Sequence, residues 1–173
     1  MYTVKSVKTF HGHDGYGWEC KLYNSANKAV AVVVEDGYGG DLQFHWTDDE
    51  APRVESPGVD WKGNPHTFID TPHESDLRAF CLTLPKWECG GEMVNTDWDI
   101  YLGNLVNAAL TLKDVKKLLR KVAITDGENI FTYNCKPDHP TVRDTIAKKH
   151  PDAVVLNDMP LNEAVDYYMA VTS

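Results

Sequence analysis

The sequence has few cysteines, and they are far apart. No two of them form a C-x-x-C pair; they are Cys20, Cys81, Cys89 and Cys135. A zinc knuckle is therefore not expected, and this spacing fits reduced thiols in the cytoplasm better than two disulfides. The chain also lacks an opening pattern of basic, apolar and small residues, so no secretory signal is expected.

Long apolar runs and an excess of positive charge are missing as well. The longest apolar run lies around residues 29–34, far short of the roughly 18 residues that suggest a membrane span. The 17 Lys and Arg residues face 26 Asp and Glu residues, for a net charge of −9. Direct binding to a nucleic-acid backbone is therefore not expected, and neither is membrane insertion.

Recognisable catalytic motifs are also missing. The chain contains no G-x-S-x-G and no H-E-x-x-H, and no cysteine has a histidine at a familiar spacing. Its glycine-rich stretches contain no lysine and precede no predicted helix, which argues against a phosphate-binding P-loop.

The chain opens with four stretches typical of β-strands, and helical patterns follow. The strand patterns cover residues 2–10, 18–23, 29–34 and 42–46, with turn residues between them. We predict an α+β fold: an N-terminal four-stranded antiparallel meander with helices packed on it, and a small C-terminal part of hairpin and helices. We expect one domain over residues 1–173, divided into a sheet (1–46), a long connection (47–71), a helical part (72–121) and a hairpin, helix, strand and helix (122–173).

Local signals fix several element boundaries. Thr71, Pro72 and Glu74 form a capping box with proline at the first helical position. A similar capping pattern at residues 111–114 predicts a bend or a fresh helix there. The turn residues 126–129, between two short apolar stretches, predict a hairpin.

The letters Asp-Gly-Tyr-Gly occur twice, at residues 14–17 and 36–39. In a meander the first and third connections lie at the same end of the sheet, so the two copies should be neighbours. The tyrosines would offer flat faces with polar tips, and the glycines would let backbone N–H groups approach a nucleotide or a peptide. Ordinary turn chemistry is the alternative explanation. The candidate binding residues are His13, Asp14, Tyr16, Asp36 and Tyr38.

A divalent metal is the cofactor that the first of these loops could hold. His11, His13 and Asp14 supply ligand types that zinc and related ions prefer. A further ligand would have to come from the second loop, and a solvated hairpin loop is the alternative. A second possible set lies further along the chain, at His66, Asp70, His73 and Glu74, although capping already accounts for Glu74.

The N-terminal sequence also resembles a group of small bacteriophage proteins. The similarity rests on residues 4–10, on Gly15-Tyr16-Gly17 and on the strand pair at residues 22–34, and it covers about the first 46 residues. It implies a protein made in the cytoplasm of a bacterial host, with an accessory role such as countering a host defence. It transfers no site residue.

Three hypotheses about function follow. The first is a non-catalytic protein that binds a host protein or a small nucleotide-like ligand through His13, Asp14, Tyr16, Asp36 and Tyr38. The second is a divalent-metal hydrolase of phosphoesters or nucleotides, with His11 and His13 as ligands and Asp14 or Asp36 as ligand or base. The third is an acidic mimic of DNA that inhibits a DNA-binding enzyme, based on the acidic block at residues 48–50. The basic helix face over residues 113–121 is typical of a solvated surface.

Overall fold

The computed structural model describes residues 1–12, 15–60 and 63–172. Its residue contacts form two compact units, Met1–Ala109 (unit 1) and Leu110–Ser173 (unit 2), where the sequence pattern predicted a single domain. Helix α2 (Trp98–Leu118) belongs to both units. It continues through residues 111–114, so no fresh helix begins there.

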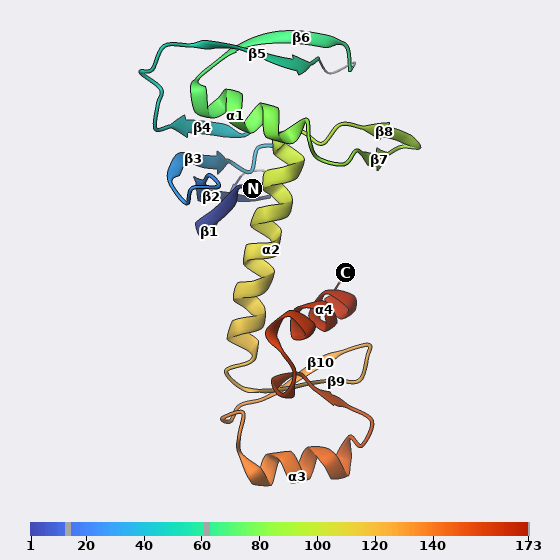
Figure 1. Ribbon diagram of the computed structural model, residues 1–173. Coiled ribbons are helices and arrows are strands. Elements are labelled where there is room, and N and C mark those ends of the chain that lie inside the picture. Colours follow the sequence, from blue (N-terminus) through green and yellow to red (C-terminus); the bar gives the residue numbers. More distant parts are fainter. Residues whose placement is uncertain (13–14, 61–62, 173) are drawn as a thin grey trace. The chain divides into compact units, whose positions relative to one another are not determined.

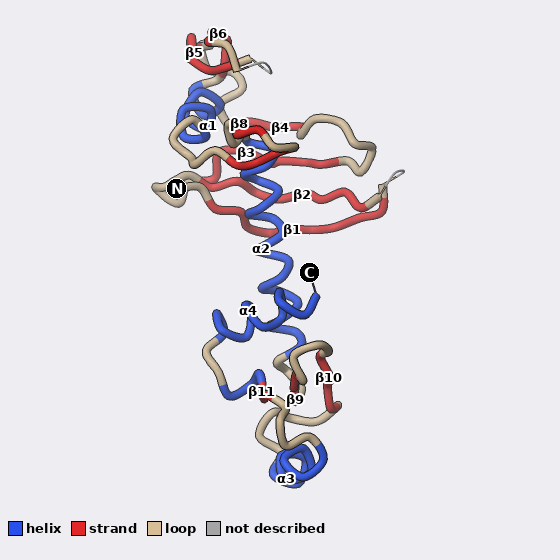
Figure 2. Tube along the Cα trace, turned by 90° about the vertical axis from the view of Figure 1, so that its right-hand side faces the viewer, coloured by secondary structure: helices blue, strands red, loops and turns tan. Residues whose placement is uncertain are grey.

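The first sheet lies in unit 1 and confirms the predicted meander. Its strands are hydrogen-bonded in the order β1-β2-β3-β4, and each pair is antiparallel. The connections β1–β2 and β3–β4 leave the sheet at the same end (Figure 2). The strands are β1 (Thr3–His11), β2 (Tyr16–Tyr23), β3 (Ala29–Glu35) and β4 (Gln43–Trp46).

Two further hairpins in unit 1 were not predicted. The first, β5 (Val54–Val59) with β6 (Pro65–Asp70), occupies most of the segment predicted as a connection. Its strands contain Pro57, Gly58 and Pro65, residues that usually mark loops or sheet edges. The second pairs β7 (Trp87–Cys89) with β8 (Glu92–Val94) through two glycines of positive φ, as a two-residue turn requires.

Helix α1 (Pro72–Cys81) lies between the β5–β6 hairpin and the four-stranded sheet (Figure 1). The predicted capping box starts it: Glu74 N–H donates to Thr71 Oγ1 at 3.1 Å, and Thr71 N–H donates to the Glu74 carboxylate at 3.3 Å. Leu77 and Cys81 are the buried residues of this helix.

The core of unit 1 gathers apolar side chains from the sheet, α1 and the first turns of α2. Phe80 of α1 packs against Tyr2, just before β1, and against Tyr101 of α2. Its ring centroid is 5.4 Å from that of Tyr2 and 5.2 Å from that of Tyr101. The Tyr101 hydroxyl donates to the Tyr2 carbonyl oxygen at 3.2 Å. The fully buried residues here include Leu22, Val30, Val33, Leu77, Leu102 and Val106.

Unit 2 contains a three-stranded sheet in the order β10-β9-β11, with all pairs antiparallel. The predicted hairpin is confirmed as β9 (Val122–Thr125) with β10 (Ile130–Tyr133). The buried strand β9 packs apolar residues on both sides: Ala123 in a cluster with Val115, Leu156 and Ala164, and Val122 and Ile124 in a cluster with Ile146. The other elements are β11 (Val154–Val155), a 3₁₀ turn η1 (Leu156–Asp158) and the helices α3 (Pro140–Lys149) and α4 (Leu161–Thr172).

Candidate functional site

The two loops that contain the repeated Asp-Gly-Tyr-Gly sequence contact each other through backbone atoms. A Cβ atom added to Gly12 would lie 2.6 Å from the carbonyl oxygen of Asp36 and 2.6 Å from the Cα of Gly37. A Cβ atom on Gly37, which has φ +75°, would lie 2.9 Å from the Cα of Gly12. Only glycine allows so close an approach, so Gly12, just before the first copy, and Gly37, within the second copy, let the two loops pack together.

The tyrosines of the same two loops extend into solvent. Tyr16 is 69% exposed and Tyr38 is 62% exposed, while Gly37 is buried. The ring of His11 lies against Tyr16, with their centroids 4.5 Å apart. We call this region, made of Gly12, Tyr16, Gly37 and Tyr38, the tyrosine surface.

Asp36 stabilises the second of these loops. Its Oδ1 accepts a hydrogen bond from the backbone N–H of Tyr38 at 2.9 Å, and its Oδ2 accepts one from Gln43 Nε2 at 3.1 Å. The neighbouring Glu35 carboxylate accepts from the N–H of Gly37 at 2.9 Å. Both carboxylates therefore hold the turn that carries Tyr38, which is the role expected from turn chemistry.

Two of the predicted binding residues, His13 and Asp14, lie outside the described residues. The same two residues are also two of the three ligands predicted for a metal ion, the third being His11. Within residues 1–12, 15–60 and 63–172, no group of three or more His, Cys, Asp or Glu residues could hold a metal ion. The second predicted set is therefore not brought together, because Asp70 binds Arg78 and Glu74 serves the capping box.

Asp70–Arg78 is the most buried ion pair among the described residues, and the sequence did not predict it. Asp70 is 2% exposed, and its two carboxylate oxygens accept from Arg78 Nε at 2.7 Å and from Arg78 Nη2 at 3.0 Å. Burial alone would raise the pKa of Asp70, but the hydrogen bonds and charge of Arg78 lower it below its usual value. The guanidinium carbon lies 3.7 Å from the ring centroid of Phe68 and 4.5 Å from that of Trp98.

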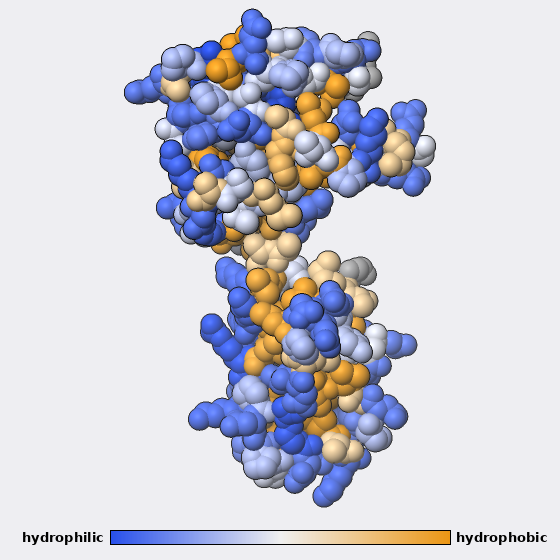
Figure 3. Space-filling view, in the orientation of Figure 1, coloured by the Kyte–Doolittle hydropathy of each residue, from blue (hydrophilic) through white to orange (hydrophobic). Residues whose placement is uncertain are grey.

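This ion pair borders a groove of about 850 Å³ in unit 1. We call it the hairpin groove, because the β7–β8 hairpin forms one wall and α1, the start of α2 and the end of β5 form the others. Figure 3 shows hydrophobic side chains gathered beside the root of this hairpin. Among the lining residues, Trp87 is 38% exposed and Met93 is 59% exposed, and Leu82 is exposed as well.

Negative charge predominates in the hairpin groove. Within the part of the chain that the structure describes, Lys86 and Arg78 are the basic lining residues, and Arg78 is already bonded to Asp70. The acidic lining residues are Asp60, Glu92, Asp97 and Asp99. Burial and the nearby charges of Asp97 and Asp41 raise the pKa of Asp99, as expected where carboxylates crowd together.

The whole net charge of the chain is in unit 1. Residues 1–109 contain eight Lys or Arg and 17 Asp or Glu, whereas residues 110–173 contain nine of each. The basic residues predicted for one helix face in unit 2 are all exposed; they are Lys113, Lys116, Lys117, Arg120 and Lys121. Unit 1 is therefore the part of the chain that attracts cations.

The two buried cysteines lack the character of nucleophiles. Burial raises the pKa of Cys20 to about 12, and burial with the nearby charge of Asp97 raises that of Cys81 to about 12. Both thiols therefore stay protonated at neutral pH, although Cys81 lines the hairpin groove.

Comparison with known proteins gives no match: no family model, no curated protein and no solved structure is similar to this chain. None of the helices in the described part of the chain has the length and apolar character needed to cross a membrane.

Proposed function

We propose that this chain is a non-catalytic binding protein of the bacteriophage accessory type, and that it engages a protein of the bacterial host through the tyrosine surface. The observation that supports this most is the exposure of Tyr16 and Tyr38 on two loops whose backbones are packed together. A tyrosine offers a large, amphipathic contact area and loses little side-chain entropy on binding. Packed loops also reduce the entropy cost of docking.

A protein partner fits this surface better than a nucleotide-like ligand. Small molecules usually bind in concave pockets that bury most of their surface. The hairpin groove is concave, but its lining residues lie between Gly58 and Ile100, and none belongs to the tyrosine surface. Interference with a host defence is the role that the phage resemblance implies.

The test is a comparison of co-purifying proteins. Tagged wild-type protein, a Tyr16→Ala/Tyr38→Ala double variant and a Tyr167→Ala control are expressed in bacteria and purified without chelator. Tyr167 is a suitable control because it is an exposed tyrosine of unit 2. We expect a host protein to be retained by the wild type and the control and lost from the double variant. Direct titration of the two purified proteins then measures the loss in affinity.

The same host proteins retained equally by all three samples would contradict the proposal. Circular dichroism of the double variant must match the wild type, so that a loss of binding reflects the surface. A nucleotide retained by the wild type and lost from the double variant would point to the nucleotide-like ligand instead.

An acidic mimic of DNA is a second candidate function, favoured by the concentration of the net charge of −9 in unit 1. Such a mimic would bind the basic cleft of a DNA-binding enzyme, and its affinity would fall steeply as salt is added. Binding that is insensitive to salt and abolished in the tyrosine double variant would exclude this candidate.

A further inference from the structure

The hairpin groove combines apolar and acidic residues in a way that the tyrosine surface does not. Trp87 and Met93 come from the two strands of the hairpin, and Leu82 comes from just beyond the end of α1. All three are exposed although they are large and hydrophobic. Tryptophan and methionine side chains are enriched at protein interfaces, and methionine adapts to different partners.

The charge of the groove restricts the kind of partner. Among the described residues that line it, four are acidic and two are basic, and one of the basic ones, Arg78, is bonded to Asp70. Unit 1 as a whole carries the full net negative charge. An acidic segment would be repelled here, whereas lysine or arginine side chains would find complementary charge.

The wall of the groove also offers backbone hydrogen-bonding groups. The strands β7 and β8 form a two-stranded sheet and pair with no other described strand. Each strand therefore has an open edge, to which an extended peptide can add as a further strand. Trp87 pairs with Val94 and Cys89 pairs with Glu92, so the side chains of Trp87 and Glu92 lie on the same face of the hairpin, whereas Met93, which pairs with Glu88, lies on the other face.

We propose that the hairpin groove binds an extended segment of a partner protein that carries both basic and apolar side chains. Its apolar side chains contact Leu82 and Trp87, and its basic ones face Glu92 and the carboxylates of Asp97 and Asp99. This site is separate from the tyrosine surface, and neither proposal depends on the other.

The test uses a fluorescent extended peptide that contains arginine and leucine and its counterpart with glutamate in place of arginine. Fluorescence anisotropy with the full chain measures the affinity for each peptide. We expect the arginine peptide to bind and the glutamate peptide to bind far more weakly. We expect Glu92→Lys to weaken binding by about tenfold, because it reverses a charge in the groove.

Matched controls come from the same hairpin and from the next one. Glu88 lies on β7, is exposed and does not line the groove, so Glu88→Lys should change the affinity by less than about twofold. Trp87→Ala should weaken binding, whereas Ile69→Ala, which removes an exposed apolar side chain from β6, should not. The Tyr16→Ala/Tyr38→Ala variant should bind the peptide as the wild type does, which separates this proposal from the proposed function.

Equal losses from Glu92→Lys and Glu88→Lys would overturn the proposal, because they would show attraction to the charge of unit 1 alone. Equal affinity for the two peptides would overturn it too. A second copy of this chain is the other occupant to test, by sedimentation at increasing concentration. Self-association that Glu92→Lys abolishes would show that the groove serves an interface between copies.

Discussion

Gly12 and Gly37 contact each other backbone to backbone, and a Cβ atom on either one would lie under 3 Å from the Cα of the other. Their contact packs residue 12 of the β1–β2 connection against residue 37 of the β3–β4 connection. The strength of this contact can be measured, because a second glycine with the same φ lies two residues further on.

Gly37→Ala should destabilise unit 1 more than Gly39→Ala does. Both glycines have φ +75°, so each substitution costs about 1 kcal/mol of backbone strain. A Cβ on Gly39 meets nothing within 4 Å, whereas one on Gly37 meets the backbone of Gly12. We expect the extra clash to cost about 1–3 kcal/mol more. Urea unfolding followed by tryptophan fluorescence reports on unit 1, because all five tryptophans lie within residues 1–109. Equal midpoints for the two variants would contradict the loop contact.

Asp70→Asn should lower the free energy of unfolding of unit 1 by about 3 kcal/mol at pH 7, because it removes the charge that pairs with the partly buried Arg78 and leaves only the Glu74 carboxylate, at 3.9 Å. The pKa of Asp70 is lowered in the folded protein, so its contribution is present above its unfolded pKa of about 4 and is lost as pH falls through the lowered value. The stability gap between wild type and variant should therefore narrow below about pH 4. Urea midpoints at a series of pH values measure this gap, and a gap that stays constant down to about pH 2 would contradict the assignment.

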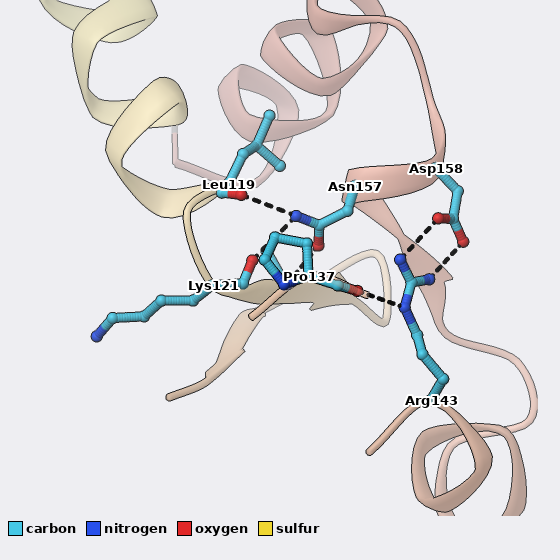
Figure 4. Close-up of polar contacts among 7 residues, drawn as sticks. Leu119, Lys121, Pro137, Arg143, Asn157 and Asp158 are labelled. Atoms are coloured by element: carbon cyan, nitrogen blue, oxygen red, sulfur yellow. Dashed lines mark hydrogen bonds and ion pairs between the residues drawn. The ribbon is translucent and has the colours of Figure 1, made fainter. Parts of the chain in front are cut away.

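Asn157→Ala should destabilise unit 2 through three hydrogen bonds (Figure 4). Asn157 Oδ1 accepts from the N–H of the buried Ala123 at 2.8 Å, and its Nδ2 donates to the carbonyl oxygens of Leu119 and Lys121 at 3.0 and 2.9 Å. An unsatisfied buried N–H costs about 1–3 kcal/mol. Amide hydrogen exchange of Ala123 should accelerate in this variant and stay unchanged in Asn162→Ala, an exposed position on α4. Unchanged exchange in both variants would show that Asn157 does not hold the strand.

Asp158→Asn should have a much smaller effect, although Arg143 contacts Asp158 through two hydrogen bonds of 2.6 and 2.8 Å. The Asp158 side chain is 61% exposed, and exposed ion pairs contribute less than about 1 kcal/mol. A double-mutant cycle with Arg143→Met and thermal unfolding followed by circular dichroism gives the coupling energy. A coupling above about 2 kcal/mol would mean that the pair behaves as a buried one.

The elements that the sequence predicted correctly are those with local signals. The capping box at Thr71 involves residues three apart in the sequence, and the strands of the meander are separated by turn residues such as Asn24, whose side chain accepts from the N–H groups of Ala26 and Lys28. The contact of Gly12 with Gly37 was predictable because the antiparallel order alone places the first and third connections together.

The hairpin groove was not predictable in the same way, because its residues come from four separate segments. The pairing of Asp70 with Arg78 depends on the position of β6 relative to α1. Strand β6 begins with a proline, and its sequence is typical of a loop. The pair Gly90-Gly91 was a usable signal for the β7–β8 hairpin, since two glycines favour a two-residue turn. The exposure of Trp87 and Met93 depends on tertiary packing, which the sequence pattern does not reveal.

The partition of charge along the chain has a consequence for its behaviour at high concentration. The hairpins β5–β6 and β7–β8 are both two-stranded, so unit 1 exposes open strand edges of the kind that seed aggregation. These edges belong to the unit that carries the entire charge of −9. Copies of unit 1 therefore repel one another before their edges can pair, and this self-repulsion keeps the edges available for a partner of opposite charge.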